Sequence, residues 1–360
     1  MDEDLCVDED LLVLLRSYVN RPALLLKRLA ECSRAELVSI LPEQERAAAR
    51  HLAERDARWL EQPGHDLVFF HDAAYPEVLK EIDDPPAALW MIGDRRRLAD
   101  LSFNVAIVGS RKASQYGRHQ ALQLATELCR QGAIVTSGLA LGIDAAAHEG
   151  ALVAEGVTLA VLRSGCDEVY PRRHWRLAER IRETGLILSE FPTGTQAYPG
   201  NFPRRNRIVT GLSQGVVVVE AGLRSGSLVS ARLALSQGRE VMAVPGPVTQ
   251  ANARGCHQLI KDGAALVESS EDVLRSLGRL EDALLSCGSV NGDLSPEEHT
   301  LLAELSRNPS SIDELVSVLG QAVDEVTVNL VSLEVMGHIF SEGGIYHAST
   351  TAVESSGLKS

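Results

Sequence analysis

The stretch VAIVGSRKASQYGRHQALQLATELCRQGAIVTSG, residues 105–138, gives the clearest indication of the fold class. It holds two short, β-branched apolar runs, VAIVG at 105–109 and AIVTS at 133–137, and a helical segment begins near Tyr116-Gly117 between them. Both runs are almost unbroken rather than alternating, which is typical of parallel strands that are covered on both faces. The stretch therefore predicts a strand, a crossover helix and a second, parallel strand.

Five more runs of the same kind follow along the chain. They are VTLAVL (157–162), LILSE (186–190), VVVVEA (216–221), EVMAV (240–244) and AALVE (264–268). The segments between them are long enough for crossover helices. Residues 105–275 are therefore predicted to form a Rossmann-like, doubly wound and mostly parallel α/β sheet.

The segments before this region have different patterns. Residues 1–64 are predicted to form an N-terminal helical, SAM-like domain, because leucines at helical spacing are interrupted by turn signals at Asn20-Arg21-Pro22 and Leu41-Pro42. Residues 65–104 contain Tyr75-Pro76 and Asp84-Pro85-Pro86. Because proline breaks helices, these residues are expected to form an irregular, packed connecting segment.

Residues 295–348 have the pattern of a winged-helix domain. Capping boxes at 295–298 and 311–314 begin two helices, and a third helix is expected over 323–336 with a stop at Gly337. Two short strands are expected around Glu342-Gly343-Gly344. Residues 276–294 are predicted to be a linker, and residues 349–360 a disordered tail.

Composition excludes several classes of protein. The 360 residues are 45% hydrophobic, but no run is long and apolar enough to span a bilayer. The acidic start MDEDLCVDED is unlike a signal or transit peptide, so a cytoplasmic protein without membrane contact is expected. The six cysteines lie far apart, and neither common nucleotide fingerprint is present. We therefore predict no metal and no cofactor.

Charge is distributed unevenly along the chain. Residues 105–268 hold 18 basic and 13 acidic residues, a net of +5, although the whole chain carries −14. Residues 295–347 hold nine acids and one base, a net of −8. Residues 105–268 are therefore the part of the chain expected to attract an anion. A transcription regulator that reads duplex DNA through the winged helix is disfavoured, because phosphate contacts need lysine and arginine.

Small polar residues follow three of the predicted strands. Ligands of open parallel sheets bind beyond the carboxyl ends of the strands. Gly109, Ser110 and Arg111 follow the first run, Ser137 and Gly138 follow the second, and Ser225 and Ser227 follow the fifth. Each turn leads into a helix N-terminus, where free N–H groups and the helix dipole bind anions. Tight turns also need glycine and serine for geometry alone, so a single turn would indicate little.

The most specific stretch is NFPRRNRIV, residues 201–209. It places Phe202 beside four polar residues: Arg204, Arg205, Asn206 and Arg207. A charge run is usually a solvated face, but these arginines precede an apolar segment and accompany an aromatic ring. Arginine forks bind phosphate, and an aromatic ring stacks on any base. This combination favours sequence-tolerant binding of single-stranded DNA.

Catalytic arrangements are weak in comparison. Asp144 and His148 lie four residues apart on a predicted helix, where they more often serve as a dipole partner and a buried hydrogen-bonding group than as an acid–base pair. Glu220 ends a strand at the ligand edge. The alternative function is therefore a Rossmann-like, nucleotide phosphoribohydrolase-type enzyme that uses Glu220. Residues 201–207 suit a polymer better than a mononucleotide, so we predict no enzyme and no catalytic residue.

Several segments together resemble the DprA/Smf family in order and spacing. They are VAIVGSRKASQYG (105–117), TSGLALGIDAAAHEGAL (136–152), GCDEVYP (165–171), SEFPTGT (189–195), NFPRRNRIVTGLS (201–213), VVVVEAGLRSGSLVSARLAL (216–235), VPGPV (244–248) and GCHQLIKDGA (255–264). The resemblance implies a homodimer that binds and protects incoming single-stranded DNA in a basic pocket. It also implies loading of the recombinase RecA onto that DNA in natural transformation (competence) and DNA recombination.

The resemblance also places the pocket. It maps family pocket residues onto the first two turns and the arginine stretch: Gly109, Ser110, Arg111, Ser137, Gly138, Phe202, Arg204, Arg205, Asn206 and Arg207. This sequence departs from the family at two places. Leu141 stands where members often carry a basic residue, and Tyr198-Pro199-Gly200 stands where a lysine often precedes the NFP motif. Binding is therefore expected to depend more heavily on the arginine stretch.

Overall fold

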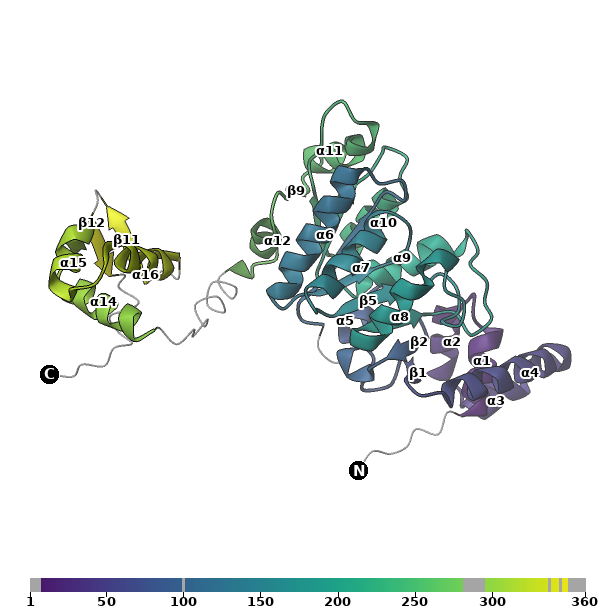
Figure 1. Ribbon diagram of the computed structural model, residues 1–360. Coiled ribbons are helices and arrows are strands. Elements are labelled where there is room, and N and C mark those ends of the chain that lie inside the picture. The colour runs from purple at the N-terminus through teal and green to yellow at the C-terminus, as the bar shows by residue number, and fades with distance from the viewer. Residues whose placement is uncertain (1–7, 99–100, 281–294, 336–337, 343–344, 349–360) are drawn as a thin grey trace. The chain divides into compact units, whose positions relative to one another are not determined.

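The computed structural model describes residues 8–98, 101–280, 295–335, 338–342 and 345–348. Contacts divide the chain into two compact units, Met1–Leu280 and Glu281–Ser360. The N-terminal helices, the connecting segment and the sheet share the first unit, so the boundary expected at residue 64 lies inside one compact unit (Figure 1). Residues 281–294 of the predicted linker, Gly337, the turn at 343–344 and the predicted tail at 349–360 lie outside the described residues.

All seven predicted runs are strands, which confirms the α/β fold class. They are β3 (Asn104–Gly109), β4 (Ile134–Ser137), β5 (Thr158–Val161), β6 (Leu186–Ser189), β7 (Gly215–Glu220), β8 (Glu240–Ala243) and β9 (Ala265–Leu266). They pair in parallel in the order β6-β5-β4-β3-β7-β8-β9. The central strand β3 aligns Val105 with Val135 of β4 and with Gly215 of β7.

The prediction of an irregular segment before β3 was wrong. Residues 65–104 contain β1 (His65–Phe69) and β2 (Ala88–Gly93), which extend the sheet beyond β6 as antiparallel strands. The prolines that suggested irregularity lie between these strands, around the short helix α5 (Glu77–Lys80), and interrupt neither of them. A 3-10 turn, η1 (Arg95–Leu98), follows β2.

Helices cover both faces of the sheet (Figure 1). Helices α6 (Gln115–Arg130), α7 (Ile143–Val153) and α12 (Ser270–Ser276) pack on the face that receives Val105 and Ile107 of β3. Helices α9 (Asn201–Gly211), α10 (Ser227–Ser236) and α11 (Arg254–Lys261) pack on the face that receives Ala106 and Val108. Alternate residues of one strand thus enter two cores, as the pleat of a strand requires. Helix α8 (Trp175–Thr184) packs over β5 and β6 beside α7.

Four N-terminal helices pack at the β1–β2 end of the sheet. They are α1 (Glu9–Ser17), α2 (Pro22–Leu29), α3 (Arg34–Ser39) and α4 (Glu43–Leu60). Trp59 of α4 meets Trp90 of β2 edge to face, with ring centroids 5.9 Å apart.

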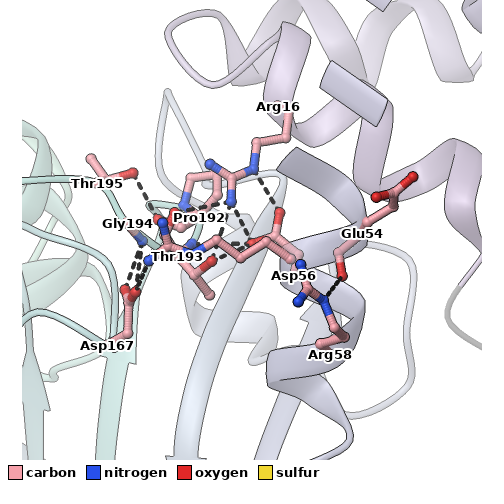
Figure 2. Close-up of polar contacts among 10 residues, drawn as sticks. Arg16, Glu54, Asp56, Arg58, Asp167, Pro192, Thr193, Gly194 and Thr195 are labelled. Atoms are coloured by element: carbon pink, nitrogen blue, oxygen red, sulfur yellow. Dashed lines mark hydrogen bonds and ion pairs between the residues drawn. The ribbon is translucent and has the colours of Figure 1, made fainter. Parts of the chain in front are cut away.

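A polar cluster attaches these helices to the loop after β6 (Figure 2). Arg16 donates two hydrogen bonds of 2.6 and 2.5 Å to the Asp56 carboxylate and one of 2.9 Å to the Thr193 carbonyl. The Thr193 hydroxyl donates to Asp56 at 2.7 Å. Beside them, Asp167 pairs with Arg55 at 2.7 Å and accepts from the Gly194 amide at 2.8 Å. We call Arg16, Asp56 and Thr193 the clasp.

The second unit has the predicted winged-helix arrangement. Helices α14 (Pro296–Arg307), α15 (Ile312–Leu319) and α16 (Val323–Val335) accompany an antiparallel sheet of β10 (Ser310–Ser311), β12 (Ile345–Ala348) and β11 (Ile339–Glu342). Both predicted capping boxes are present, at Ser295 with Glu298 and at Ser311 with Glu314. Among the residues that the structure describes, no helix is long and apolar enough to cross a membrane.

Candidate functional site

The main candidate site is a pocket of about 600 Å³ beyond the carboxyl ends of β3, β4, β5 and β7. From β3 the chain proceeds through β4 to β6 on one side of the sheet, and β7 to β9 lie on the other side. The strand order therefore reverses at β3 and β7. Open α/β sheets place their ligands at this point, because the loops diverge there.

Most of the predicted site residues line this pocket. They are Gly109, Ser110, Arg111, Gly138, Phe202, Arg205, Asn206, Ser225 and Ser227. Lys112, Arg163, Arg224 and Asn252 line it as well and were not predicted. Arg163 directly follows the third predicted strand, so selecting residues beyond every strand end would have found it. Arg224 lies in the same loop as Ser225.

Two glycines let the loops approach each other closely. A Cβ on Gly138 would lie 1.5 Å from Nη1 of Arg205, so the guanidinium lies directly against that backbone. Gly142 has φ of 82°, and a Cβ there would lie 2.2 Å from the Ser110 carbonyl oxygen. The Ser110 amide in turn donates to the Glu220 carbonyl at 2.7 Å. The turns after β3, β4 and β7 are thereby held as one surface.

Two helices begin at the pocket without a side-chain cap. Helix α9 follows Gly200 and helix α10 follows Gly226, and neither residue can cap with a side chain. The hydroxyls of Ser225 and Ser227 lie 2.7 Å apart at the start of α10. The first amides of both helices make local hydrogen bonds, such as that of the Leu228 amide to the Ser225 carbonyl at 3.2 Å. The two serine hydroxyls and the helix dipole are therefore the features here that suit an anion such as phosphate.

Arg205 forms the floor of the pocket. Its side chain donates 3.0 Å hydrogen bonds to the Val161 carbonyl and to the Asn206 side chain, and the residue is only 3% exposed. Burial lowers the pKa of this guanidinium to about 10, while the nearby Asp144 carboxylate raises it. Arg205 therefore remains charged at neutral pH, in a site with little water around it.

Phe202 lies against two guanidinium groups. The Arg111 guanidinium carbon is 4.8 Å from the ring centroid, and that of Arg205 is 5.6 Å away. The ring also packs against Gly226, where a Cβ would lie 2.7 Å from a ring carbon. The ring is half-buried and lines the pocket, so it offers a base a stacking surface beside the two guanidinium groups.

The lining side chains carry a clear excess of positive charge. Arg111, Lys112, Arg163, Arg205 and Arg224 are set against one carboxylate, Asp144. Burial raises the pKa of Asp144, and the Arg205 and Arg111 charges oppose that rise. Low-dielectric walls focus a field of one sign, so the pocket attracts anions.

Three predicted site residues do not line this pocket. Ser137 is buried and donates its hydroxyl to the Ile107 carbonyl at 2.6 Å. Arg204 and Arg207 both contact Oε2 of Glu190, at 3.0 and 2.5 Å. Residues three apart share one face of a helix, so the arginine stretch divides between two faces of α9. Arg204 also donates to the Val19 carbonyl at 2.6 Å, which joins it to the N-terminal helices.

The candidate catalytic groups are engaged in structural contacts. Glu220 is 4% exposed and accepts hydrogen bonds from the Ser114 amide, from the Ser114 hydroxyl at 2.5 Å and from the Asn252 amide at 3.0 Å. His148 is fully buried, lies 2.7 Å from the Thr158 hydroxyl and has a pKa lowered by burial to about 3. Neither Glu220 nor His148 lines the pocket, whereas Asp144, the third candidate, does.

Comparisons with known proteins identify the family of the chain. Residues 66–278 match the family described as DNA recombination-mediator protein A, and residues 290–344 match the DprA winged helix domain. Protein Smf of Escherichia coli K12 is 43% identical over 296 residues, which cover 80% of this chain and 78% of that protein. DNA processing protein DprA of Bacillus subtilis is 42% identical over 60% of this chain and 72% of its own length.

Solved structures give the same relationship. DNA processing protein A from Streptococcus pneumoniae superimposes with a TM-score of 0.64 at 32% identity, over 75% of this chain and 98% of that chain. DNA processing protein A from Helicobacter pylori, reported for its single-stranded DNA binding mode, superimposes with a TM-score of 0.54 at 31% identity, over 60% and 97%. Family matches, sequence identity over most of the chain and the shared fold agree, and the chain belongs to the DprA/Smf family of DNA-processing proteins.

Proposed function

We propose that this chain binds single-stranded DNA in the pocket at β3 and β7, as a binding protein rather than an enzyme. One observation carries the proposal. Five cationic side chains, the half-buried ring of Phe202 and a single carboxylate line one pocket, at which two helices begin. Cations that follow a backbone, together with a ring on which bases stack, are the two components of sequence-tolerant single-strand binding.

Each part of the pocket has a distinct task. Arg111, Arg163 and Arg205 pair with successive phosphates, since an arginine fork matches two phosphate oxygens. The hydroxyls of Ser225 and Ser227 bind a phosphate at the start of α10, where the helix dipole favours it. Phe202 stacks on a base.

The position of Phe202 favours a single strand over a duplex. The ring lies inside the pocket, against Gly226 and two guanidinium groups. A base reaches it only after leaving its own stack, and a duplex opposes this by a few kcal/mol. The Helicobacter pylori relative, reported for a single-stranded DNA binding mode, supports the same ligand here.

We further infer that the bound strand is protected and passed to the recombinase RecA, in natural transformation and recombination in the cytoplasm. The family description as a recombination mediator supports this role. A homodimer would place two pockets on one strand and raise affinity through effective concentration. Light scattering of the purified protein tests the dimer. Assembly of RecA on strands covered by a single-strand-binding protein, with and without this chain, tests the loading.

Fluorescence anisotropy across a salt series tests the central proposal. A labelled oligothymidylate should bind more tightly than a duplex of the same length. A plot of the logarithm of its association constant against the logarithm of the salt concentration should have a negative slope of about 0.7 per phosphate contact. Equal affinity for both forms, or no binding of the strand at low salt, would refute the proposal.

The alternative function is nucleotide hydrolysis by Glu220. It is disfavoured because Glu220 is buried, does not itself line the pocket and already accepts hydrogen bonds from Ser114 and Asn252. Release of base from nucleoside monophosphates by the wild type, abolished in Glu220→Gln, would establish the enzyme instead.

Arg204→Ala should leave single-strand binding nearly unchanged, with an affinity within about two-fold and an unchanged salt slope. The physical reason is that Arg204 faces Glu190 and the N-terminal helices rather than the pocket. The same anisotropy titration measures both quantities, and thermal unfolding confirms that the variant is folded. A slope lower by about 0.7 would show instead that Arg204 contacts a phosphate.

A further inference from the structure

A second groove lies on the outer side of the loop after β3. It has a volume of about 790 Å³ and runs between the start of α6, helix α7 and the 3-10 turn η2 (Arg172–His174). Its charged and ionisable side chains include Arg118, His119, Arg173 and His174, with Glu149 as the acid. Both arginines are exposed. The proposed function makes no use of this groove.

The groove and the pocket are separated by little more than one loop. Gly142 lines the groove, and a Cβ on it would lie 2.2 Å from the carbonyl of Ser110, which lines the pocket. His174 of the groove lies 2.9 Å, through Nδ1, from the carbonyl of Leu139. The neighbours of Leu139, Gly138 and Ala140, line the pocket. The turn η2 is thus anchored directly beside the pocket.

Arginines and exposed rings occupy the segment that joins the two hollows. Arg163 lines the pocket, and its guanidinium carbon lies 4.4 Å from the ring centroid of Tyr170. The exposed ring of Tyr170 is followed by η2 and then by Trp175, whose ring is also exposed and lies 5.4 Å from the Arg176 guanidinium. Large rings exposed among arginines offer stacking surfaces to unpaired bases.

We propose that single-stranded DNA leaving the pocket passes over Tyr170 and η2 into the groove, where Arg118 and Arg173 hold further phosphates. This inference rests on the proposed function and extends it to the path of the strand. The occupant is a strand because the groove is open, carries exposed arginines and lies one loop away from a basic pocket, which suits a flexible polyanion. The two hollows together then define one extended binding track.

The test compares oligothymidylates of about 4 and about 16 nucleotides, which bracket the site sizes of single-strand modules. The track variant is Arg118→Gln with Arg173→Gln. Its matched control is Arg130→Gln with Arg180→Gln, which removes the same charge from exposed positions on α6 and α8. Arg130 lies 12 residues beyond Arg118 on α6, about 18 Å along the helix axis, and neither control residue lines the groove.

The track variant should bind the long strand about 25-fold more weakly at 0.1 M salt, with a salt slope lower by about 1.4, because two phosphate contacts are lost. Its affinity for the short strand should match that of the wild type, and the control should bind both strands as the wild type does. An unchanged slope with the long strand, or an equal loss in the control, would overturn the inference. Failure of the wild type to bind either strand would instead refute the proposed function.

Intrinsic fluorescence gives a second, local measurement. Among the three tryptophans, Trp175 is 54% exposed, whereas Trp59 and Trp90 are 7% and 1% exposed. The long strand should quench the emission of the wild type more than the short strand does, and Trp175→Phe should remove that difference. Equal quenching by both lengths at saturation would show that the strand does not pass η2.

Discussion

Replacing Arg205 by alanine is expected to weaken single-strand binding by about 2–5 kcal/mol, or about 30-fold and more. Arg205 is 3% exposed, and its guanidinium lies against Gly138 and contacts the ring of Phe202. A phosphate that pairs with it does so with little intervening water, so the lost interaction exceeds that of a rim arginine. The salt slope should fall by about 0.7, as for one phosphate contact on a single strand.

Part of this loss should be recovered by a second change at Asp144. Arg205 and Arg111 offset the Asp144 carboxylate, which is the one acid among the lining side chains. In Arg205→Ala this charge repels the strand, so adding Asp144→Asn should restore part of the affinity. Asp144→Asn alone should tighten binding. Because burial raises the pKa of Asp144, lowering the pH toward that pKa should also tighten binding by the wild type.

Anisotropy titrations of the four proteins measure this coupling, with Arg204→Ala as the neighbouring control. Thermal unfolding must show that each variant is folded. An Arg205→Ala protein that is folded and binds within about two-fold of the wild type would exclude Arg205 from the binding site.

The position of the site could be predicted from the sequence because it follows from topology. Seven unbroken apolar runs indicate a parallel sheet, and small residues after the first, second and fifth runs mark its ligand edge. The structure brings Gly109, Gly138 and Ser225 together because β3, β4 and β7 are neighbours. This expectation needed only the apolar runs and the small residues after them, and the order of the strands came from the structure.

The division of the arginine stretch between two faces of α9 could not be predicted, because the sequence alone did not show which face of the helix lies toward the pocket. Nothing local in NFPRRNRIV shows that Glu190, which directly follows β6, would engage Arg204 and Arg207. The contacts of β1 and β2 are likewise long-range. Their apolar runs were present in the sequence, but the prolines between them suggested irregular structure. Short runs are specified by pairing partners as much as by their own residues.

The clasp is another feature that no local pattern predicts, and breaking it should have the largest effect on stability. Arg16→Ala should lower the free energy of unfolding by about 3–5 kcal/mol, because it leaves the fully buried Asp56 carboxylate without its cation. Urea unfolding of the full chain measures the loss. Arg58→Ala is the matched control: Arg58 is exposed and its Nε donates only within α4, to the Glu54 carbonyl at 3.2 Å (Figure 2). Arg58→Ala should lower the free energy of unfolding by at most about 0.5 kcal/mol.

The pH dependence identifies the buried charge as the cause. Burial raises the pKa of Asp56, and Arg16 opposes that rise, so removing Arg16 should raise this pKa further. A carboxyl with a raised pKa in the folded state stabilises the fold at pH values below its unfolded pKa of about 3.9. That contribution is lost as pH increases through the folded pKa. The penalty of Arg16→Ala should therefore be smaller near pH 4 than near pH 7. Adding Asp56→Leu to Arg16→Met removes both charges and should restore most of the stability. If the loss of unfolding free energy is independent of pH and persists in this double variant, its cause is lost packing rather than the buried charge.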